Sequence, residues 1–393
     1  MNRNLLLLTL CQGLFFTNNV TFVAINGLVG LQIAPRGWMA TLPLTAYVGG
    51  AALAAQLVAR HQRAYGRQRC FQNGLLVAIV SAGVCAVAAM TRNFGLLLAA
   101  TLAAGYYSAN AALYRFAAVE LVDGPHKAKA ISWVLTGGIL GGVIGPSLAS
   151  GTRDVLSQPF AGAYVALMVV AAISWLVMSR IQFPPLVDPG SAAVPGRSVR
   201  ELARQPAFVV AIAAAALGYG VMNLLMAASP IAMQQCAHPF SAVALVLETH
   251  VLAMFVPSFF TGHLIRRFGV LRVMTAGVLL NLACVLFALS GQDVMHFVGA
   301  LVMLGLGWNF LYIGGTTLFT ETYRPQEKTQ AQATMDTTVA ATMAVTSFSS
   351  GALVTTGGWQ WMNLGSLLPM AATAAALFWL ARQRARAQNR PSD

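Results

Sequence analysis

Long apolar stretches alternate with short polar loops along almost the whole chain. Crossing a bilayer as a helix takes about 20 mostly apolar residues. Twelve stretches reach this length, and most contain Gly, Ser or Thr, which the interiors of membrane helices tolerate. The pattern predicts an all-α integral membrane protein. Its twelve expected transmembrane helices cover residues 5–30, 38–58, 70–91, 95–119, 130–151, 159–179, 206–230, 240–262, 272–290, 296–320, 331–355 and 360–381.

The longest hydrophilic stretch, residues 181–205, is rich in proline and glycine and lies between the sixth and seventh expected helices. Such a composition is typical of a linker. It therefore predicts two six-helix bundles, residues 1–180 and 206–393, the second ending in a short basic tail.

Two basic loops lie at corresponding places in these halves. Residues 262–272 read GHLIRRFGVLR, and residues 59–69, which lie 203 positions earlier, read ARHQRAYGRQR. An arginine, Arg63 or Arg266, stands three residues before the second glycine in each loop. Glu120 and Glu321 recur with nearly the same offset, each seven residues before a lysine. The repetition indicates a duplicated, pseudo-symmetric chain in which the loops mark corresponding turns.

The composition also indicates a membrane protein, since 57% of the residues are hydrophobic and only 9% are charged. An ordinary soluble domain has about 25% charged residues. The apolar run near the N-terminus is interpreted as an uncleaved first helix, because no small-residue cleavage site precedes a polar mature domain. The five cysteines are scattered without metal-ligand spacing, so no metal, cofactor or disulfide framework is expected.

The net charge of +13 is distributed by side of the membrane. With the N-terminus inside, 20 of the 24 Lys and Arg residues fall in cytoplasmic segments and three fall outside. Cytoplasmic loops attract positive charge, so both termini and the linker are expected in the cytoplasm. The basic balance therefore reflects topology and not nucleic-acid binding. We expect a monomeric, multi-pass protein of the bacterial inner membrane, with the lipid bilayer as its solvent.

Twelve spans, a repeated half, a central linker and the basic loop after the second span resemble the major facilitator superfamily over essentially the whole chain. The family loop, written G-x-L-a-D-R-x-G-R-[RK], is matched at Gly262, Leu264, Arg267 and Gly269, and in the first half at Gly66 and Arg67. Ala59 replaces the leading glycine, and Arg63 and Arg266 stand where the family has aspartate. The resemblance implies a secondary transporter that works by alternating access, with these loops as part of its gate.

The fifth span carries Gly137, Gly141, Gly145 and Pro146. This is similar to the glycine-proline motif of antiporters in the superfamily, although Ala149-Ser150 replaces its final glycine pair. Glycines four residues apart lie on one helix face and allow close approach of another helix. The resemblance implies a gating role for this face, while plain helix packing is the alternative.

Ionisable groups inside spans are costly, at roughly 2.5–3.5 kcal/mol on insertion scales, and are functional candidates by default. Glu248 lies about nine residues into the eighth span, close to the middle of the membrane, and His250 follows it. Both are candidates for proton coupling. The alternative is that each is a hydrogen-bonded packing residue.

Asp336 lies near the expected cytoplasmic start of the eleventh span. Because Arg63 replaces the family's aspartate, we hypothesise that these two residues pair when the cytoplasmic side closes. The alternative is an acid that interacts with the N-terminal dipole of its own helix.

Uncharged polar and aromatic residues gather at similar depths in spans 1, 4, 7 and 10, where transporters of repeated architecture bind their substrates. A pocket of amides and aromatic rings suits a planar or amphiphilic organic solute, whereas packing between helices is the alternative. The candidates are Asn18, Asn19, Tyr107, Asn110, Tyr219, Asn223, Trp308, Asn309 and Tyr312.

Motifs of catalysis or ATP use are missing from the sequence, which has no Gly-x-Ser-x-Gly, no Gly-x4-Gly-Lys and no His-Glu-x-x-His. We expect no enzyme, and energy from an ion gradient, with protons as the coupling ion. The resulting hypothesis is that the protein carries a small organic solute, with export as the favoured direction. Uptake of a metabolite or vitamin-like solute is the second hypothesis, and a non-transporting membrane receptor is a third from another class.

Overall fold

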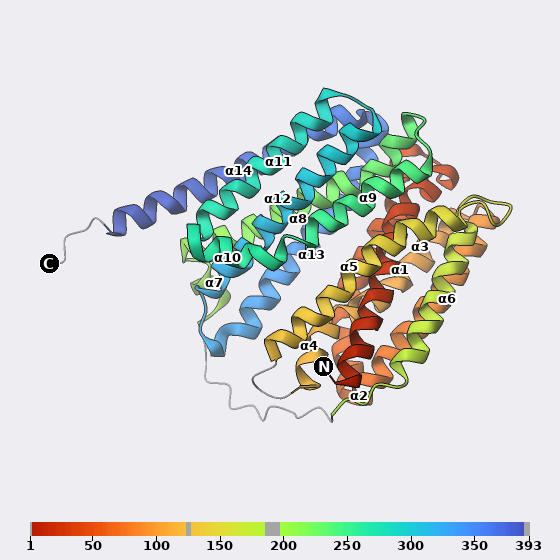
Figure 1. The fold of residues 1–393 in the computed structure, drawn as a ribbon, viewed down its shortest axis with the longest axis horizontal. Coiled ribbons are helices and arrows are strands. Elements are labelled where there is room, and N and C mark those ends of the chain that lie inside the picture. The colour runs from red at the N-terminus through yellow and green to blue at the C-terminus, as the bar shows by residue number, and fades with distance from the viewer. Residues whose placement is uncertain (1, 123–126, 185–196, 389–393) are drawn as a thin grey trace. The chain divides into compact units, whose positions relative to one another are not determined.

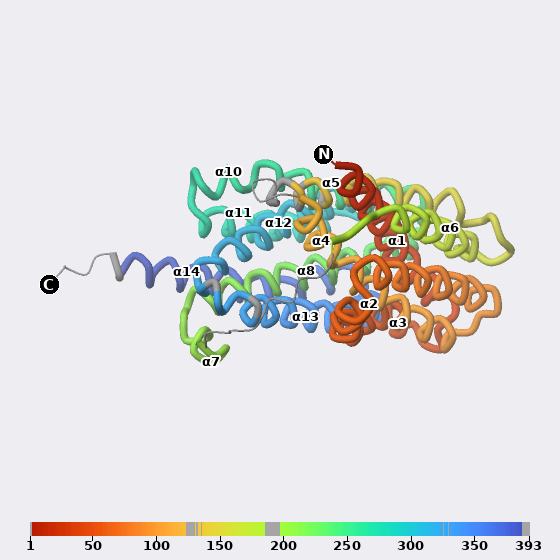
Figure 2. Tube along the Cα trace, turned by 90° about the horizontal axis from the view of Figure 1, so that it is seen from below, coloured from red at the N-terminus to blue at the C-terminus, as the bar shows by residue number. Residues whose placement is uncertain are grey.

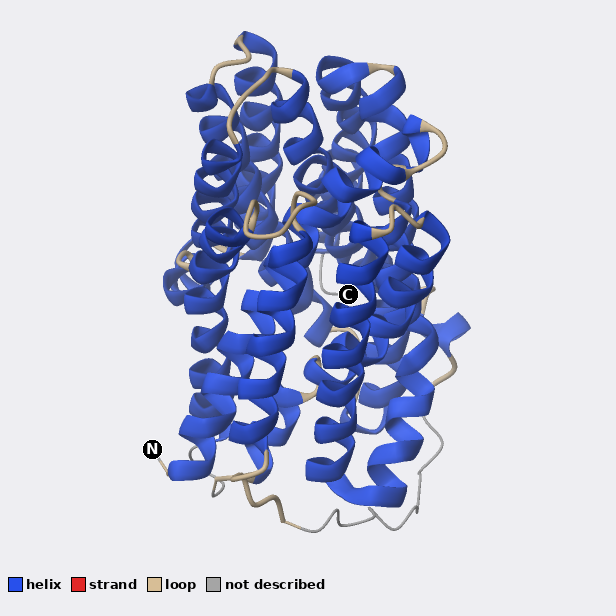
Figure 3. Ribbon diagram, turned by 90° about the vertical axis from the view of Figure 1, so that its right-hand side faces the viewer, coloured by secondary structure: helices blue, strands red, loops and turns tan. Residues whose placement is uncertain are grey.

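The computed structural model describes residues 2–122, 127–184 and 197–388. This part of the chain is helical and contains no β-strand (Figure 3). Nine of its helical segments are individually long and apolar enough to cross a membrane, and a pair of helices bent by 43° makes a tenth. Residues 185–196 of the expected linker and Arg390 of the basic tail lie outside the described residues.

The described helices follow one another along the chain, and apart from the stretch between α6 and α7 their connections are short (Figure 1). In order they are α1 (Arg3–Ile33), α2 (Leu42–Met90), α3 (Phe94–Ala111), α4 (Tyr114–Glu120), α5 (Lys127–Thr152), α6 (Ala161–Met178), α7 (Val199–Leu202), α8 (Pro206–Gln235), α9 (Phe240–Phe255), α10 (Ser258–Phe268), α11 (Val270–Ser290), α12 (Val294–Thr320), α13 (Lys328–Thr356) and α14 (Gly358–Gln388). Each of the twelve expected spans falls on these helices. The long α2 contains two of them, and the pairs α3–α4 and α9–α10 each make up one.

The two basic loops share an unusual backbone conformation. Gly66 interrupts α2 with φ 80° and ψ 167°, and Gly269 separates α10 from α11 with φ 87° and ψ 151°. Residues with a side chain are essentially excluded from this region of φ and ψ. The common geometry is what the sequence repeat predicts for corresponding turns, and it explains why each loop needs its second glycine.

The chain packs as two compact units, which are described separately. Unit 1 comprises Met1–Pro189 and Pro230–Val251, and unit 2 comprises Gly190–Ser229 and Leu252–Asp393. This division follows packing, whereas the predicted bundles follow chain order, so those bundle boundaries stay a prediction. The segment Pro230–Val251 joins unit 1 through α5, where the Gly142 backbone lies against the Val251 side chain.

In unit 1, the glycines of α5 lie against the backbone of α1. A Cβ atom added at Gly137 would lie 2.3 Å from the Thr9 carbonyl oxygen, and one at Gly141 would lie 2.1 Å from that of Gly13. Since real Cβ atoms do not approach other atoms this closely, only glycine permits the contact. The predicted close helix approach is therefore present. In the same unit α2 and α3 lie side by side (Figure 2).

In unit 2, α11 packs against α10, α12 and α14. Arg197, the first described residue of unit 2, is held by an ion pair. Its guanidinium donates to both carboxylate oxygens of Glu327 at 2.8 Å. The backbone N–H groups of Arg197 and Arg324 donate to the same buried carboxylate. These donors, the Arg197 side chain first, hold the pKa of Glu327 well below its usual range.

Candidate functional site

Three aromatic side chains of unit 2 form a compact group between α8 and α12, here called the aromatic trio. The rings of Trp308 and Tyr312 are stacked, with centroids 5.1 Å apart and an angle of 9° between their planes. Tyr219 stands edge-on to both, at 5.4 and 5.5 Å. Trp308 is buried, and its indole N–H has no hydrogen-bond partner among the described residues. Tyr219 and Tyr312 are half-buried, so part of each residue is accessible.

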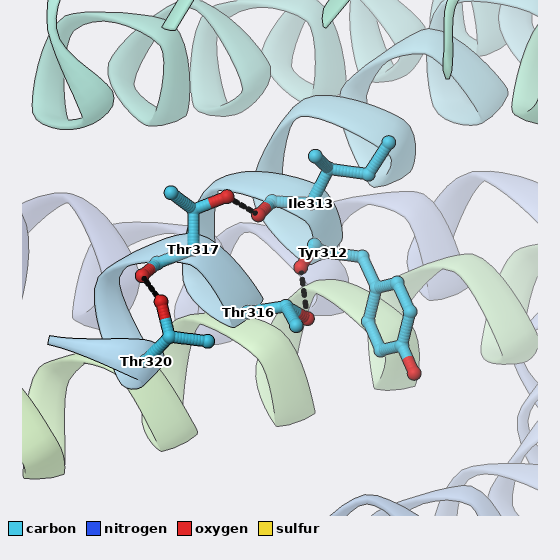
Figure 4. Close-up of a pocket in the computed structure, with 5 residues that line it drawn as sticks. All are labelled: Tyr312, Ile313, Thr316, Thr317 and Thr320. Carbon is cyan, nitrogen blue, oxygen red and sulfur yellow. Dashed lines mark hydrogen bonds between the residues drawn. The ribbon is translucent and has the colours of Figure 1, made fainter. Parts of the chain in front are cut away.

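A shallow hollow of about 280 Å³ begins at Tyr312 and follows α12 towards its end (Figure 4). It is lined by Tyr312, Ile313, Thr316, Thr317 and Thr320. Each threonine hydroxyl donates to a carbonyl of its own helix at 2.7–2.8 Å. A hydroxyl has one hydrogen and two lone pairs, so these groups retain only the capacity to accept. The hollow therefore has a mainly apolar surface with a row of three hydroxyl acceptors in it, next to an aromatic surface.

The amide of Asn223, one of the predicted solute ligands, connects α8 to α13. Its Nδ2 atom lies 2.8 Å from Ser347 Oγ, 3.0 Å from Thr346 Oγ1 and 3.2 Å from the Met343 carbonyl oxygen. These contacts hold the two helices together and occupy the donor side of the amide.

Asn309 fills a structural position at the bend of a membrane span. Its amide nitrogen donates to the Met254 carbonyl and to Ser258 Oγ, both at 2.7 Å, and its oxygen accepts from Thr261 at 2.6 Å. Met254 lies in the last turn of α9, and Ser258 begins α10, so Asn309 holds the bend in place. The Asn309 side chain is fully buried, and the three hydrogen bonds given above are all made with groups of the protein itself.

The predicted ligands of unit 1 differ in their partners. Asn19 accepts a hydrogen bond from Tyr47 at 3.0 Å, while Asn18 and Tyr107 are buried and the Tyr107 hydroxyl interacts with Asn18 and Ser174. Asn110 follows Tyr107 by three residues on α3, and its amide donates to the Tyr106 carbonyl of its own helix and accepts from Cys70. Asn18, Asn19 and Tyr107 therefore belong to one group of interacting polar side chains with Tyr47, which stays a candidate for binding a solute or water.

The proton-coupling candidates lie in unit 1. The half-buried carboxylate of Glu248 accepts a short hydrogen bond from Ser147 of α5. Ser147 directly follows Pro146 of the glycine-proline face, so the carboxylate contacts the helix for which a gating role is expected. His250 is fully buried on the same helix, two residues on.

The two arginines Arg63 and Arg67 of the first basic loop have different partners. Arg67 forms an ion pair with Glu120 of α4, with 2.8 Å between Nε and Oε2, and also donates to Gln62. Arg63 donates to the Ala59 carbonyl of its own helix. Asp336, in unit 2, is exposed. The pairing of Arg63 with Asp336 stays a prediction, because the two residues belong to different units.

Two features of these sites were missed in the sequence. The threonine row is visible there as Gly-Gly-Thr-Thr-Leu-Phe-Thr at residues 314–320, but threonine is common in membrane helices and gave no specific signal. Ser147 was missed because its importance comes from a contact with a residue 101 positions away.

The comparisons with known proteins agree on one family. A model of the Major Facilitator Superfamily matches residues 210–393. The riboflavin transporter RfnT of Brucella anthropi is 36% identical over 363 residues, which is 92% of this chain and 91% of the relative. The chain belongs to the major facilitator superfamily. An uncharacterised transporter of this superfamily from Bacillus subtilis, YdeG, is 28% identical over 88% of the chain and 85% of its own length.

Solved structures of the superfamily agree in fold. The nucleoside transporter NupG superposes with a TM-score of 0.77 at 12% identity, covering 96% of this chain and 99% of NupG. A bacterial homologue of the human lysosomal transporter Spinster gives 0.72 at 14% identity, covering 96% of both chains. At these identities the likeness shows the fold alone. As a major facilitator, the protein is a multi-pass membrane transporter of a small solute.

Proposed function

We propose that the protein takes up a flavin-like solute, consisting of a planar heteroaromatic ring with a hydroxylated chain. The relative of 36% identity is named as a riboflavin transporter, which supports this class of solute. The observation that carries the proposal is the aromatic trio with the threonine row beside it on α12. Vitamin-like uptake thereby takes precedence over the export of amphiphiles that the sequence favoured.

The aromatic trio suits the ring of such a solute. Aromatic rings prefer offset-stacked or edge-to-face neighbours, and each such pair adds about 0.5–1.5 kcal/mol beyond the burial of area. The half-exposed Tyr219 and Tyr312 offer these contacts, while the buried Trp308 supports Tyr312 from behind.

The threonine row suits the hydroxylated chain of the solute. Its hydroxyl groups accept but no longer donate, and the hydroxyls of a polyol supply the donors they need. Pockets for drug-sized ligands start at about 300 Å³. A hollow of about 280 Å³ therefore fits the chain of the solute, with the ring outside it on the aromatic trio.

Proton coupling is assigned to Glu248 within this proposal. When ionised, its carboxylate accepts from Ser147, and when protonated it becomes a donor itself. Protonation thus changes the contact between α9 and α5, the helix whose glycine face lies against α1. His250 is a second candidate for the same step.

Counterflow in proteoliposomes tests the function. Vesicles loaded with unlabelled riboflavin should accumulate labelled riboflavin through the wild-type protein. Removal of the hydroxyls in Thr316→Val and Thr320→Val should raise the KM for riboflavin about threefold to tenfold each, as expected for a lost hydrogen bond. Inhibition by lumichrome, which has the ring but lacks the chain, should not change in these variants.

Thr275→Val is the matched control, because this exposed threonine also donates to its own helix but lies on α11 outside the hollow. An equal rise of KM in the control would contradict the chain subsite. Binding of riboflavin without counterflow would instead support a receptor. Rescue of a riboflavin auxotroph tests the direction, and loss of cellular riboflavin on expression would indicate export.

A gating pair of Arg63 and Asp336 is also part of the proposal. Transport should fall in Arg63→Asp and in Asp336→Arg and recover in the double exchange, because the exchange restores opposite charges. If the double exchange transports no better than either single variant, the pairing is wrong.

A further inference from the structure

One end of unit 2 carries five exposed arginines on three helices, here called the arginine face. Arg266 and Arg267 end α10, and Arg272 lies in the first turn of the adjoining α11. Arg382 and Arg386 lie near the end of α14, which packs against α11. The five side chains are exposed, and among the described residues none of them forms an ion pair within 4 Å.

The acidic residues at the same end of unit 2 have other partners. Glu321 binds Arg384 at 2.9 Å, and Glu327 binds Arg197. Glu201 caps its own short helix by accepting from Ser198. Among the described residues, the arginine face is therefore not neutralised by these carboxylates, and its charge can attract an anion.

Exposed aromatic residues accompany these arginines on the same helices. Phe259 and Phe260 on α10 are 63% and 47% exposed, and Phe378 and Trp379 on α14 are 58% and 47% exposed. The Arg382 guanidinium lies 4.2 Å from the ring centroid of Phe378. Tryptophan is enriched at the interface between lipid tails and headgroups, as Trp379 would be one to two turns before this basic helix end, and the exposed phenylalanines offer apolar surface to lipid tails.

We propose that the arginine face is a docking surface for the headgroups of anionic phospholipids. Its charge is complementary to a lipid phosphate, and guanidinium groups bind phosphate oxygens in pairs. The exposed rings on the same helices place the arginines at headgroup depth, where a lipid is held by its chains as well as its phosphate. A soluble anion would use only the charges. This inference does not depend on which solute the protein carries.

Native mass spectrometry of the purified protein, with added phosphatidylglycerol or phosphatidylcholine, tests the proposal. The wild type should retain phosphatidylglycerol in preference to phosphatidylcholine. Each basic residue near an anionic surface contributes about 1 kcal/mol, which corresponds to about a fivefold change in affinity. The double variants Arg266→Gln/Arg267→Gln and Arg382→Gln/Arg386→Gln should therefore each weaken phosphatidylglycerol binding about thirtyfold.

The control is Arg36→Gln/Arg92→Gln, which removes two exposed arginines of unit 1 on the expected outer side of the membrane and lowers the net charge equally. An equal loss in this control would overturn the proposal, because the effect would then follow net charge. Displacement of the lipid by millimolar inorganic phosphate would also overturn it, in favour of a soluble anion. The thermal midpoint of each variant without added lipid should match the wild type, which excludes misfolding as the cause of a loss.

Discussion

Replacement of Gly141 by alanine should separate α1 from α5. The new Cβ would lie 2.1 Å from the Gly13 carbonyl oxygen and 2.7 Å from the Thr17 nitrogen. An ordinary contact begins at 3.4 Å, so the two backbones must move apart by about 1.3 Å. Forcing extra atoms into a packed contact costs about 1–3 kcal/mol. Neither partner is a flexible side chain that can yield, so we expect the upper part of this range.

The other glycines of α5 give a graded series for the same measurement. Gly137→Ala should behave like Gly141→Ala, with its Cβ at 2.3 Å, while Gly145→Ala, at 3.0 Å, should be mild. Gly151→Ala is the control, since nothing lies within 4 Å of its Cβ. A thiol-reactive dye can follow thermal unfolding in detergent, because Cys11, Cys70, Cys85 and Cys284 are buried.

Transport should fall in the same order as stability, because the glycine face is part of the expected gate. If Gly141→Ala unfolds at the same temperature as Gly151→Ala, the close approach of α1 and α5 does not exist in solution. If it is destabilised but transports normally, the contact is structural and the gating role is wrong.

Three further predictions concern other parts of the chain. Gly66→Ala should lose about 1–3 kcal/mol through backbone strain, since its φ of 80° excludes a side chain, and Gly262→Ala, with no positive φ, should be neutral in the same unfolding assay. Because the pKa of Glu327 is lowered in the folded state, its stabilising effect is present above the unfolded value of about 4.3 and is lost as the pH falls below it. In the wild type the thermal midpoint should therefore decline as the pH falls from about 5 to 3, and Glu327→Gln should make this decline smaller. If the decline is unchanged in the variant, other carboxylates cause it. Glu248→Gln should abolish riboflavin accumulation driven by a pH gradient but leave counterflow intact, and normal pH-driven accumulation in this variant would contradict the assignment.

The positions of the helices could be predicted from the sequence because crossing a membrane is a property of each segment alone. Every expected span falls on a described helix, and the glycines of α5 lie on the face that their spacing indicated. The glycine turns at Gly66 and Gly269 were likewise local signals, and they share the same conformation.

The roles of individual polar residues could not be predicted in this way. Asn309 looked like a solute ligand, yet its amide holds the bend between α9 and α10. Which way a polar side chain faces depends on contacts between helices that are distant in sequence, and hydropathy does not record them. The same reason hid Ser147, whose partner Glu248 was itself recognised because a charge in a span is rare.

The threonine row has a consequence for which forms of a solute can pass. Each of its hydroxyls donates its hydrogen to a backbone carbonyl. The oxygens of a phosphate ester are acceptors, so they would face the lone pairs of these hydroxyls without a hydrogen between them. A vitamin that is phosphorylated after entry would therefore bind the threonine row poorly and would be a poor substrate for export. If the protein takes up its solute as proposed, the threonine row would thus help the cell to retain the phosphorylated form, because that form would be a poor substrate for return transport.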